Sequence, residues 1–302
     1  MTEPERPRRL LVIFNPTAGG ARKRYLDATL KALEALGCPI TLWPTAAPGH
    51  AESLARAVTL ELADVVVAAG GDGTINEVVN GLLDATRYEP PLPLAVLPLG
   101  TANVLAHELG LPRRAGQLAR AIATGAIRPV GLGRVDQRYF LSMIGVGFDA
   151  QVVASVDLAL KRRLGKAAYV IESVRQLISF RSPGYRLTIA DTSHRAASAI
   201  VTRGRFYGGR FVCAPQASLF SPRFQLCRFT RSGPWNVIRY GALLVLGRLP
   251  KAADFKIEGA ERLTIEGPEG DPVQGDGDLI GRLPVTVELV PDALNLVVPN
   301  DA

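Results

Sequence analysis

The chain has 302 residues, of which 47% are hydrophobic and 21% charged, so it is long enough for two domains and has the composition of a globular protein. Its formal net charge of +7 favours polyanionic partners such as nucleotides, anionic lipid surfaces or nucleic acid, without choosing among them. Three widely separated cysteines indicate neither a disulfide framework nor a zinc site, and no apolar run approaches the roughly 20 residues that span a bilayer.

The first part of the chain, residues 1–128, alternates patterns typical of strands and helices. Runs of apolar and β-branched residues predict strands, and apolar residues at helical spacing predict helices between them. The predicted strands cover residues 10–15, 40–43, 65–69 and 94–100, and the predicted helices run through Leu26–Leu36, Leu54–Leu62 and Ile75–Leu83. This alternation predicts an open parallel sheet with helices on both faces.

After Arg128, short strand patterns follow one another. They cover residues 138–145, 185–190, 198–202, 224–229, 261–267, 285–290 and 294–298. One long helical pattern interrupts them at about residues 150–180, and a shorter one follows Pro234. We therefore expect an α/β protein with an N-terminal open α/β domain (residues 1–128) and a C-terminal antiparallel β-sandwich domain (residues 129–302), with the return of the final strand to the first domain left open.

A glycine-rich loop stands between the strand at 65–69 and the next helix. It consists of Gly70, Gly71, Asp72, Gly73 and Thr74. Glycine lets backbone amides approach a phosphate closely, and the first amides and the dipole of a helix favour negative charge. An acid there suits a bound Mg²⁺, because a hard cation accepts carboxylate and phosphate oxygens together. The same residues also fit a plain turn in which Asp72 or Thr74 caps the helix.

Two further polar loops follow predicted strands. Asn15 lies in the loop FNPTAGG, and Gly100 and Thr101 lie in the loop LPLGTAN. In an open parallel sheet, ligands bind outside the carboxyl ends of the strands. These loops and the glycine-rich loop are therefore expected to face one crevice.

In this order and spacing, the segments FNPTAGG, GGDGTINEVVNGL and LPLGTANVLAHELG resemble the diacylglycerol kinase catalytic-domain family, which includes bacterial lipid kinases and the sphingosine and ceramide kinases. Later segments, from GVGFDAQVV to the terminal QGDGDLIGRLPVTVELVPDALNLVVP, look like the second domain of that family. The resemblance implies a nucleotide-binding α/β domain, a β-sandwich domain that receives lipid, and transfer of the γ-phosphate of ATP to a lipid hydroxyl in an interdomain cleft.

By this match, one set of residues contacts the nucleotide: Asn15, Thr45, Gly70, Gly71, Asp72, Gly73, Thr74, Asn76, Gly100 and Thr101. Asp72 is also the expected metal residue, engaging Mg²⁺ through water, and one of two expected catalytic residues. The other is Asp278, because the family's tail reads Asp-Gly-Glu with the Glu as general base, and this chain has Asp276-Gly277-Asp278.

From the residues alone, simpler roles remain open. Thr45 and Thr101 also fit helix caps, and Asn15 also fits the shaping of an Asn-Pro turn. Glu77 either orients the loop by hydrogen bonding or is an ordinary acid in the first helical turn. The sequence GDGD also fits a turn between strands. Asp276 is the rival base, since in an extended segment it shares a face with Asp278.

Two more positions depart from the family pattern. Val104 follows Asn103 where many relatives have Asp, so a second metal-orienting acid is absent there. Ser221-Pro222 stands where some relatives have an Asp-Gly metal loop in the second domain, so we do not expect a structural Mg²⁺ in that loop.

The sequence therefore predicts an ATP- and Mg²⁺-dependent lipid kinase of phospholipid biosynthesis that acts on diacylglycerol or a related neutral lipid. The alternatives are a sphingoid or ceramide kinase, an NAD kinase-like enzyme, which shares GGDGT, and a non-catalytic nucleotide or lipid sensor. We expect a cytoplasmic protein at the inner membrane surface, with a membrane lipid substrate and no nucleic acid partner, and a homodimer remains open. The expected contact with anionic lipid is a basic cluster in the long helical pattern: Lys161, Arg162, Arg163 and Lys166.

Overall fold

The computed structural model describes residues 6–16, 20–84, 91–155, 177 and 182–300, and it divides into two compact units. Unit 1 comprises residues 1–130 and 292–302, and unit 2 comprises residues 131–291. Two strands belong to both units, since β5 (Ala126–Val135) leaves unit 1 and β18 (Val285–Val298) returns to it.

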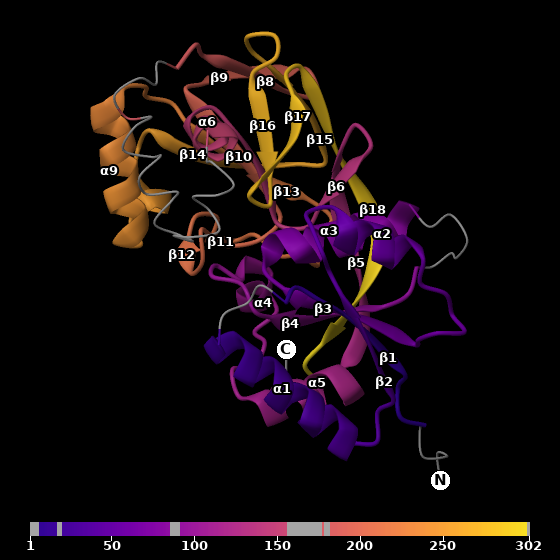
Figure 1. Cartoon of the computed structure of the whole chain (residues 1–302). Coiled ribbons are helices and arrows are strands. Elements are labelled where there is room, and N and C mark those ends of the chain that lie inside the picture. The colour runs from indigo at the N-terminus through magenta and orange to yellow at the C-terminus, as the bar shows by residue number, and fades with distance from the viewer. Residues whose placement is uncertain (1–5, 17–19, 85–90, 156–176, 178–181, 301–302) are drawn as a thin grey trace. The chain divides into compact units, whose positions relative to one another are not determined.

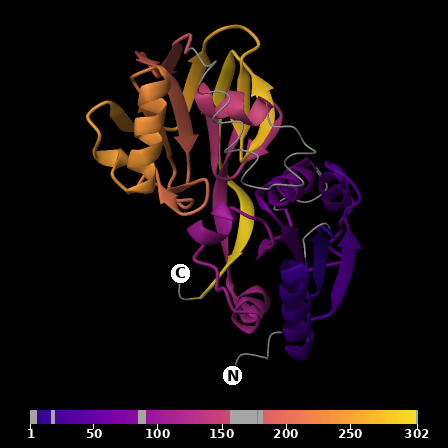
Figure 2. The same ribbon diagram turned by 60° about the vertical axis from the view of Figure 1, so that its left-hand side comes forward.

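Unit 1 is an open parallel sheet with helices on both faces (Figure 1, Figure 2). Its elements in chain order are β1 (Leu10–Phe14), α1 (Gly20–Ala35), β2 (Ile40–Pro44), α2 (His50–Arg56), β3 (Val65–Gly70), α3 (Asp72–Asp84), β4 (Leu94–Pro98), α4 (Val104–Glu108), α5 (Ala115–Thr124) and the start of β5. The strands lie in the order β2-β1-β3-β4, all parallel, and the end of β18 runs parallel to β4.

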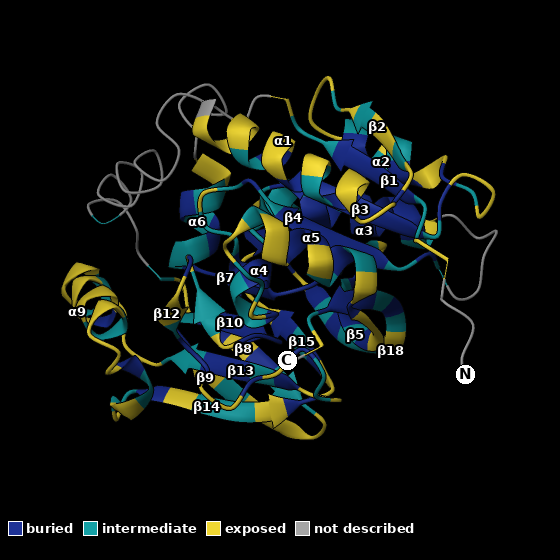
Figure 3. Cartoon of the chain, turned by 90° about the horizontal axis from the view of Figure 1, so that it is seen from below, coloured by how far each residue is buried: buried dark blue, intermediate teal, exposed yellow. Residues whose placement is uncertain are grey.

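The inner strands of unit 1, β1, β3 and β4, are buried on both faces, whereas the edge strand β2 is largely exposed. On one face Val12 and Val67 pack with Leu33 of α1 and Leu118 of α5, and Figure 3 shows those helices exposed on the outside with buried strands beneath them. The alternate residues, such as Val66, are equally buried, because α2 and α3 cover the other face. This double burial explains the uninterrupted apolar runs of the strand sequences.

Unit 2 is an antiparallel β-sandwich with helices attached. After β5 its elements are β6 (Arg138–Phe140), β7 (Met143–Val146), α6 (Phe148–Ser155), β8 (Tyr185–Ile189), β9 (Thr192–Ala196), β10 (Ser198–Thr202), β11 (Phe206–Tyr207), β12 (Phe211–Val212), β13 (Phe224–Phe229), α9 (Pro234–Val245), the 3₁₀ helix η1 (Leu249–Lys251), β14 (Phe255–Ala260), β15 (Arg262–Glu266), β16 (Pro272–Gly275), β17 (Asp278–Arg282) and the start of β18. One sheet has the order β14-β13-β10-β7-β16-β17, and the other includes β18-β15-β8-β9.

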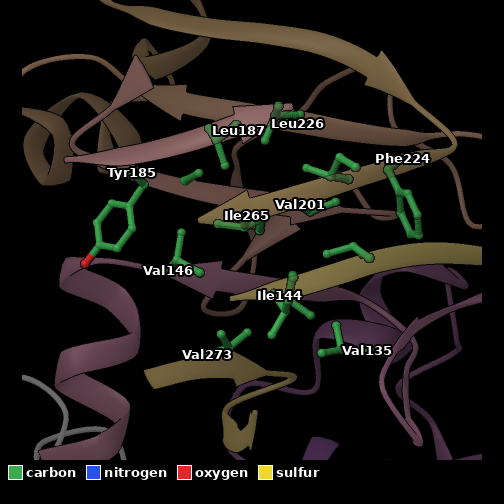
Figure 4. Packing of buried hydrophobic residues seen from close by; sticks show 14 of the residues in the cluster. Val135, Ile144, Val146, Tyr185, Leu187, Val201, Phe224, Leu226, Ile265 and Val273 are labelled. Carbon is green, nitrogen blue, oxygen red and sulfur yellow. The ribbon is translucent and has the colours of Figure 1, made fainter. Parts of the chain in front are cut away.

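The core of unit 2 lies between these two sheets. Ile144 and Val201 from the first sheet meet Leu187 and Ile265 from the second, and all four are buried (Figure 4). Side chains that alternate inward from both sheets are the mark of a sandwich. The expected fold class, an open α/β domain followed by an antiparallel sandwich, is confirmed.

Several predicted elements have different bounds in the structure. α2 ends at Arg56 instead of continuing through Leu62, because the β-branched pair Val58-Thr59 follows it and the amide of Leu62 bonds to Thr59 in a separate turn. The segment 138–145 is split into β6 and β7. The two strands predicted over residues 285–298 form one strand, β18, which continues through Asp292 at φ +47°.

Of the long helix predicted at about residues 150–180, the structure describes α6 and Leu177. The expected lipid-contacting cluster, Lys161, Arg162, Arg163 and Lys166, lies outside the described residues. Among the helices that the structure describes, none is long and apolar enough to cross a membrane.

Candidate active site

The parallel strands of unit 1 end in register at one edge of the sheet. Their last residues are Pro44, Phe14, Gly70 and Pro98. The residues that follow are hydrogen-bonded to the neighbouring strands. The backbone amide of Asn15 donates to the carbonyl of Ala69, and the backbone amide of Thr45 donates to the carbonyl of Phe14. The loops after the strands therefore gather at this edge, where open parallel sheets bind their ligands.

Two of these loops touch through their glycines. A Cβ added at Gly100 would lie 2.4 Å from the Cα of Gly71, and one added at Gly71 would lie 3.2 Å from the Cα of Gly100. Gly70 also has no room for a side chain, because a Cβ there would lie 2.5 Å from the Cβ of Thr74. The turn from β3 into α3 therefore requires glycine at positions 70 and 71, and its backbone contacts the loop that follows β4.

Asp72 is the first residue of α3, and Gly73 and Thr74 continue the helix, so the glycine-rich loop is shorter than its sequence suggested. The Oδ1 of Asp72 accepts a long hydrogen bond, 3.4 Å, from the amide of Leu105 in α4. Asp72 therefore links the starts of two helices, and it directly follows Gly71 in the chain.

Asn103 carries a buried acceptor atom at the same place. Its backbone is left-handed (φ 49°, ψ 48°), and its Nδ2 donates to the carbonyl of Gly100 at 3.0 Å. Its Oδ1 is buried and receives no hydrogen bond from the part of the chain that the structure describes. A Cβ at Gly100 would lie 2.6 Å from this oxygen, so the acceptor lies next to the glycine contact. A buried acceptor without a donor fits a site that a ligand completes.

Thr45 and Thr101 are not helix caps, because the caps of α2 and α4 are Gly49 and Asn103. The hydroxyl of Thr101 instead accepts a 2.7 Å hydrogen bond from Nη2 of Arg22, in the first turn of α1. Arg22 is a cation that the sequence analysis missed. Its signal is the basic run ARKR directly after FNPTAGG.

Asn76 and Glu77 are neighbours on α3 with different surroundings. The carboxylate of Glu77 accepts hydrogen bonds from the amides of Gly49 (2.8 Å) and Ala51 (3.1 Å), so it holds the N-terminus of α2. These bonds give Glu77 a hydrogen-bonding role at the start of α2, and neither of them runs to the glycine-rich loop. Asn76 is buried within unit 1, and its Oδ1 accepts a 3.1 Å hydrogen bond from Asn80 one turn later.

In unit 2, the sequence Asp276-Gly277-Asp278 forms the turn of the hairpin β16–β17. Asp276 and Gly277 both have positive φ, 50° and 91°, which is the mark of a two-residue type I′ turn. Asp278 is the first residue of β17 and pairs with Gly275. The expectation that the two aspartates share one face of an extended segment is therefore wrong, because the turn separates them.

The two aspartates also differ in what they contact. The carboxylate of Asp276 accepts hydrogen bonds from the backbone amides of Leu141, Ser142 and Met143, at 2.7, 2.9 and 3.0 Å. These bonds divide the predicted strand 138–145 into β6 and β7. The side chain of Asp278 is exposed. Asp276 anchors the hairpin, and Asp278 faces solvent at the start of the next strand.

A partly buried chain of hydrogen bonds holds the same turn. The amide of Gly277 donates to Oε1 of Gln274 at 3.0 Å, and Nε2 of Gln274 donates to Oδ2 of Asp149 at 2.6 Å. The hydroxyl of Tyr207 donates to the other oxygen of Asp149. Burial raises the pKa of Asp149 despite these two donors, and burial together with Asp149 raises the pKa of Tyr207.

Two family models match the chain and meet near its middle. Residues 9–135 match the diacylglycerol kinase catalytic domain, and residues 142–298 match the YegS C-terminal NAD kinase beta sandwich-like domain. The chain belongs to the diacylglycerol kinase family. It is therefore a lipid kinase by class, and the family resemblance of its motifs is confirmed.

Relatives in this family align along nearly the whole chain. The diacylglycerol kinase of Bacillus subtilis (strain 168) is 29% identical over 298 residues, which cover 97% of each chain. That of Staphylococcus saprophyticus is 27% identical over 301 residues, which cover 97% of this chain and 96% of the relative. The crystal structure of a diacylglycerol kinase from Bacillus anthracis str. Sterne shows the same fold, with a TM-score of 0.79, 22% identity and 99% of both chains covered.

The loop that contains Ser221-Pro222, where the sequence departs from the family pattern, binds the side chain of Arg203. The guanidinium of Arg203 is buried, and its Nη2 donates to the carbonyl oxygens of Leu219 and Ser221. Burial lowers the pKa of Arg203 to about 10. The carbonyls of the loop that contains Ser221-Pro222 are thus bound by a cation that belongs to the chain itself.

Proposed function

We propose that this lipid kinase transfers the γ-phosphate of ATP, with Mg²⁺, to the hydroxyl of diacylglycerol or a related neutral lipid. The observation that carries the proposal is that relatives named diacylglycerol kinase align with both units, over 97% of this chain. The glycine contact in unit 1 and the exposed aspartate of the hairpin in unit 2 support it. Phosphoryl transfer needs bound phosphates, charge neutralisation and a base for the acceptor, and these features offer each of them.

In this proposal, the turn from β3 into α3 binds the phosphates. Gly70, Gly71 and Gly100 keep side chains away from the backbone, and the N-terminus of α3 favours negative charge. The other nucleotide contacts are Asn15, Thr45, Gly73, Thr74 and Thr101, with Arg22 as an added cation. Asn76 is buried, so in this proposal it supports the site by fixing the position of α3 through its hydrogen bond with Asn80.

Mg²⁺, when bound, neutralises charge that develops between the phosphates. The residues that would hold it are Asp72 and Asn103. Both offer hard oxygen atoms, the donor type that Mg²⁺ prefers, and Oδ1 of Asn103 is the buried acceptor that no described group supplies with a hydrogen bond.

Asp278 is the general base. Its carboxylate takes the proton of the lipid hydroxyl while the hydroxyl oxygen bonds to the γ-phosphorus and the bond from that phosphorus to ADP breaks. Asp276 is held away from this role because its oxygens accept three backbone amides. Aspartate supplies the same carboxylate as glutamate on a stem shorter by one methylene, so the acceptor hydroxyl approaches closer to the strand.

A panel of acceptors tests the proposal. The full chain is incubated with labelled ATP, Mg²⁺ and one of diacylglycerol, sphingosine, ceramide or NAD, and the products are separated by thin-layer chromatography. We expect labelled phosphatidic acid that disappears when Mg²⁺ is chelated. A phosphorylated sphingolipid alone would make the protein a sphingoid or ceramide kinase, and phosphorylated NAD alone would make it an NAD kinase. ATP binding without any product would make it a sensor.

A further inference from the structure

The helix α9 turns apolar side chains outward. Trp235 is 80% exposed, Ile238 46% and Val245 64%, and the cap residue Leu246 is 66% exposed. At the helical period these four positions fall within about 100° of the circumference, as one stripe. Figure 3 shows α9 as an exposed helix over most of its length. A helix normally turns such a stripe toward a core, so an outward stripe marks an interaction surface.

The opposite face of α9 is fixed to the sandwich through Tyr240, its buried residue. The rings of Tyr240 and Phe229 meet edge to face with centroids 5.0 Å apart, and the hydroxyl of Tyr240 donates to the carbonyl of Asp254 at 3.2 Å. Rotation of the helix to bury the apolar stripe would break these contacts. The orientation of the stripe is therefore set by the packing of unit 2.

The sequence around the stripe carries positive charge. Between Thr230 and Lys251 there are four basic residues, Arg231, Arg239, Arg248 and Lys251, and no Asp or Glu. The first acid after this segment, Asp254, forms ion pairs with Arg231 and Arg239. The guanidinium of Arg239 also lies over the ring of Tyr240, with its Cζ 4.7 Å from the ring centroid, so its position on α9 is fixed.

We propose that α9 lies flat on an anionic phospholipid bilayer, with its stripe at the boundary between headgroups and acyl chains. Tryptophan prefers that boundary, and basic residues beside it gain from anionic headgroups. The inference rests on the proposed function, because it names the surface through which a kinase of a membrane lipid reaches its substrate. The sequence analysis expects the basic cluster at residues 161–166 to contact anionic lipid. The helix α9 is a second docking element, and it lies in a part of the chain that the structure describes.

The charge pattern favours a bilayer over a second copy of the chain. A twofold interface places the same patch on both partners, so two copies joined through α9 would bring together two segments that each carry four basic residues and the single acid Asp254. Like charges oppose such a contact. An anionic bilayer complements the same residues and accepts the apolar stripe.

Fluorescence of Trp235 tests the orientation. The chain has two tryptophans, so Trp43→Phe leaves Trp235 as the single emitter. With vesicles of phosphatidylcholine and phosphatidylglycerol, we expect its emission to shift to the blue and brominated acyl chains to quench it. Sedimentation with the vesicles without a shift or quenching would place the docking surface elsewhere and overturn the inference.

A variant without the stripe tests the consequence for turnover. Trp235→Gln/Val245→Gln/Leu246→Gln removes exposed apolar groups and keeps the buried Tyr240. We expect vesicle partitioning to fall at least about 30-fold, with a matching loss of activity on diacylglycerol in vesicles. Melting temperature, ATP affinity and turnover of dissolved dioctanoylglycerol should stay at wild-type values.

The matched control is Leu60→Gln/Leu62→Gln, which removes apolar residues of 50% and 44% exposure from unit 1. It should bind vesicles as the wild type does, and an equal loss in the control would overturn a specific role for α9. A lipid-free dimer that the stripe variant loses, seen by sedimentation velocity, would assign the stripe to a second copy and also overturn it.

Failure of this inference is distinct from failure of the proposed function. Normal lipid turnover together with undiminished vesicle binding by the stripe variant would remove the inference and leave the kinase. Insertion of Trp235 into vesicles without phosphorylation of any lipid would support the docking surface and remove the proposed reaction.

Discussion

Asp276 and Asp278 carry the same group two positions apart, and the hairpin gives them different tasks. Asp278→Asn keeps the shape and removes the basic carboxylate, so we expect kcat to fall by about 10²–10⁴-fold with little change in ATP affinity. Asp278→Glu should retain part of the activity. Steady-state kinetics on diacylglycerol and isothermal titration with ATP measure these effects.

The control for this prediction is Asp276→Asn. In the wild type both carboxylate oxygens of Asp276 accept hydrogen bonds from backbone amides. The substitution replaces one of these oxygens by an NH₂ group, which is itself a donor, so the melting temperature should fall. An Asp276→Asn protein that stays folded without activity, beside a normally active Asp278→Asn protein, would transfer the role of base to Asp276.

Asp149 makes stability depend on pH. Burial raises its pKa above the ordinary value of 3.8, so the folded state favours the protonated carboxyl. This contribution to stability is fully present below the unfolded pKa and is lost as pH rises through the raised folded pKa. In Asp149→Asn it is absent, so the unfolding free energy of wild type minus that of the variant should decrease as pH rises above about 4.

Urea unfolding of both proteins in steps between about pH 4.5 and pH 7.5 measures this difference. Asparagine has a single acceptor oxygen, so it replaces only one of the two bonds that the carboxylate accepts from Tyr207 and Gln274, and this loss shifts the variant by a similar amount at every pH. An increase of the difference with pH would contradict the raised pKa.

The contact of the two loops in unit 1 depends on glycine at both ends. In Gly100→Ala the new Cβ meets the Cα of Gly71 and Oδ1 of Asn103, so the loops must separate. We expect ATP binding to weaken by about tenfold or more, measured by calorimetry. Gly116→Ala in α5 is the matched control, because a Cβ there meets nothing within 4 Å. Equal affinities of the two variants would remove the loop contact from the nucleotide site.

The loop at 219–221 depends on Arg203 for its donor groups. Arg203→Met leaves the carbonyls of Leu219 and Ser221 without this partner, and we expect the unfolding free energy to fall by about 2–4 kcal/mol. Mg²⁺ should not restore the loss, since Ser221-Pro222 supplies no carboxylate. Denaturant titrations with and without Mg²⁺ measure both effects, and a rescue by Mg²⁺ would show that the loop still holds a metal.

The inner strands of unit 1, β1, β3 and β4, could be predicted because strands buried on both faces have uninterrupted apolar runs, as at residues 65–69. Exposed strands with a polar or irregular sequence could not. β9 (TSHRA) and the start of β5 (AIRP) are mostly exposed and lack a regular apolar pattern. The contacts of the site were also hidden, because they join distant residues. Arg22 and Thr101, which form a hydrogen bond, are 79 residues apart in the sequence, and Asp276 and Leu141 are 135 residues apart. Contacts at such separations produce no periodic pattern from which they could be predicted.

Unit 1 is completed by residues that come after all of unit 2. Leu296 is fully buried in β18 and pairs with Leu94 of β4. Leu296→Ala should lower the unfolding free energy by about 2–5 kcal/mol and weaken ATP binding, although it lies far in sequence from the glycine-rich loop. Asn295→Ala, at the neighbouring partly exposed position, should change stability by less than about 0.5 kcal/mol. Equal effects of the two changes would mean that β18 adds little to unit 1.

The return of β18 also sets an order of assembly during synthesis. The ribosome releases β1 to β4 first, yet the edge of β4 stays unpaired until residues 292–298 have been made. Unit 2 is continuous in sequence, from residue 131 to residue 291, so it is able to close on itself before unit 1 has its last strand. The half of the nascent chain that is translated first is therefore the half that finishes folding last.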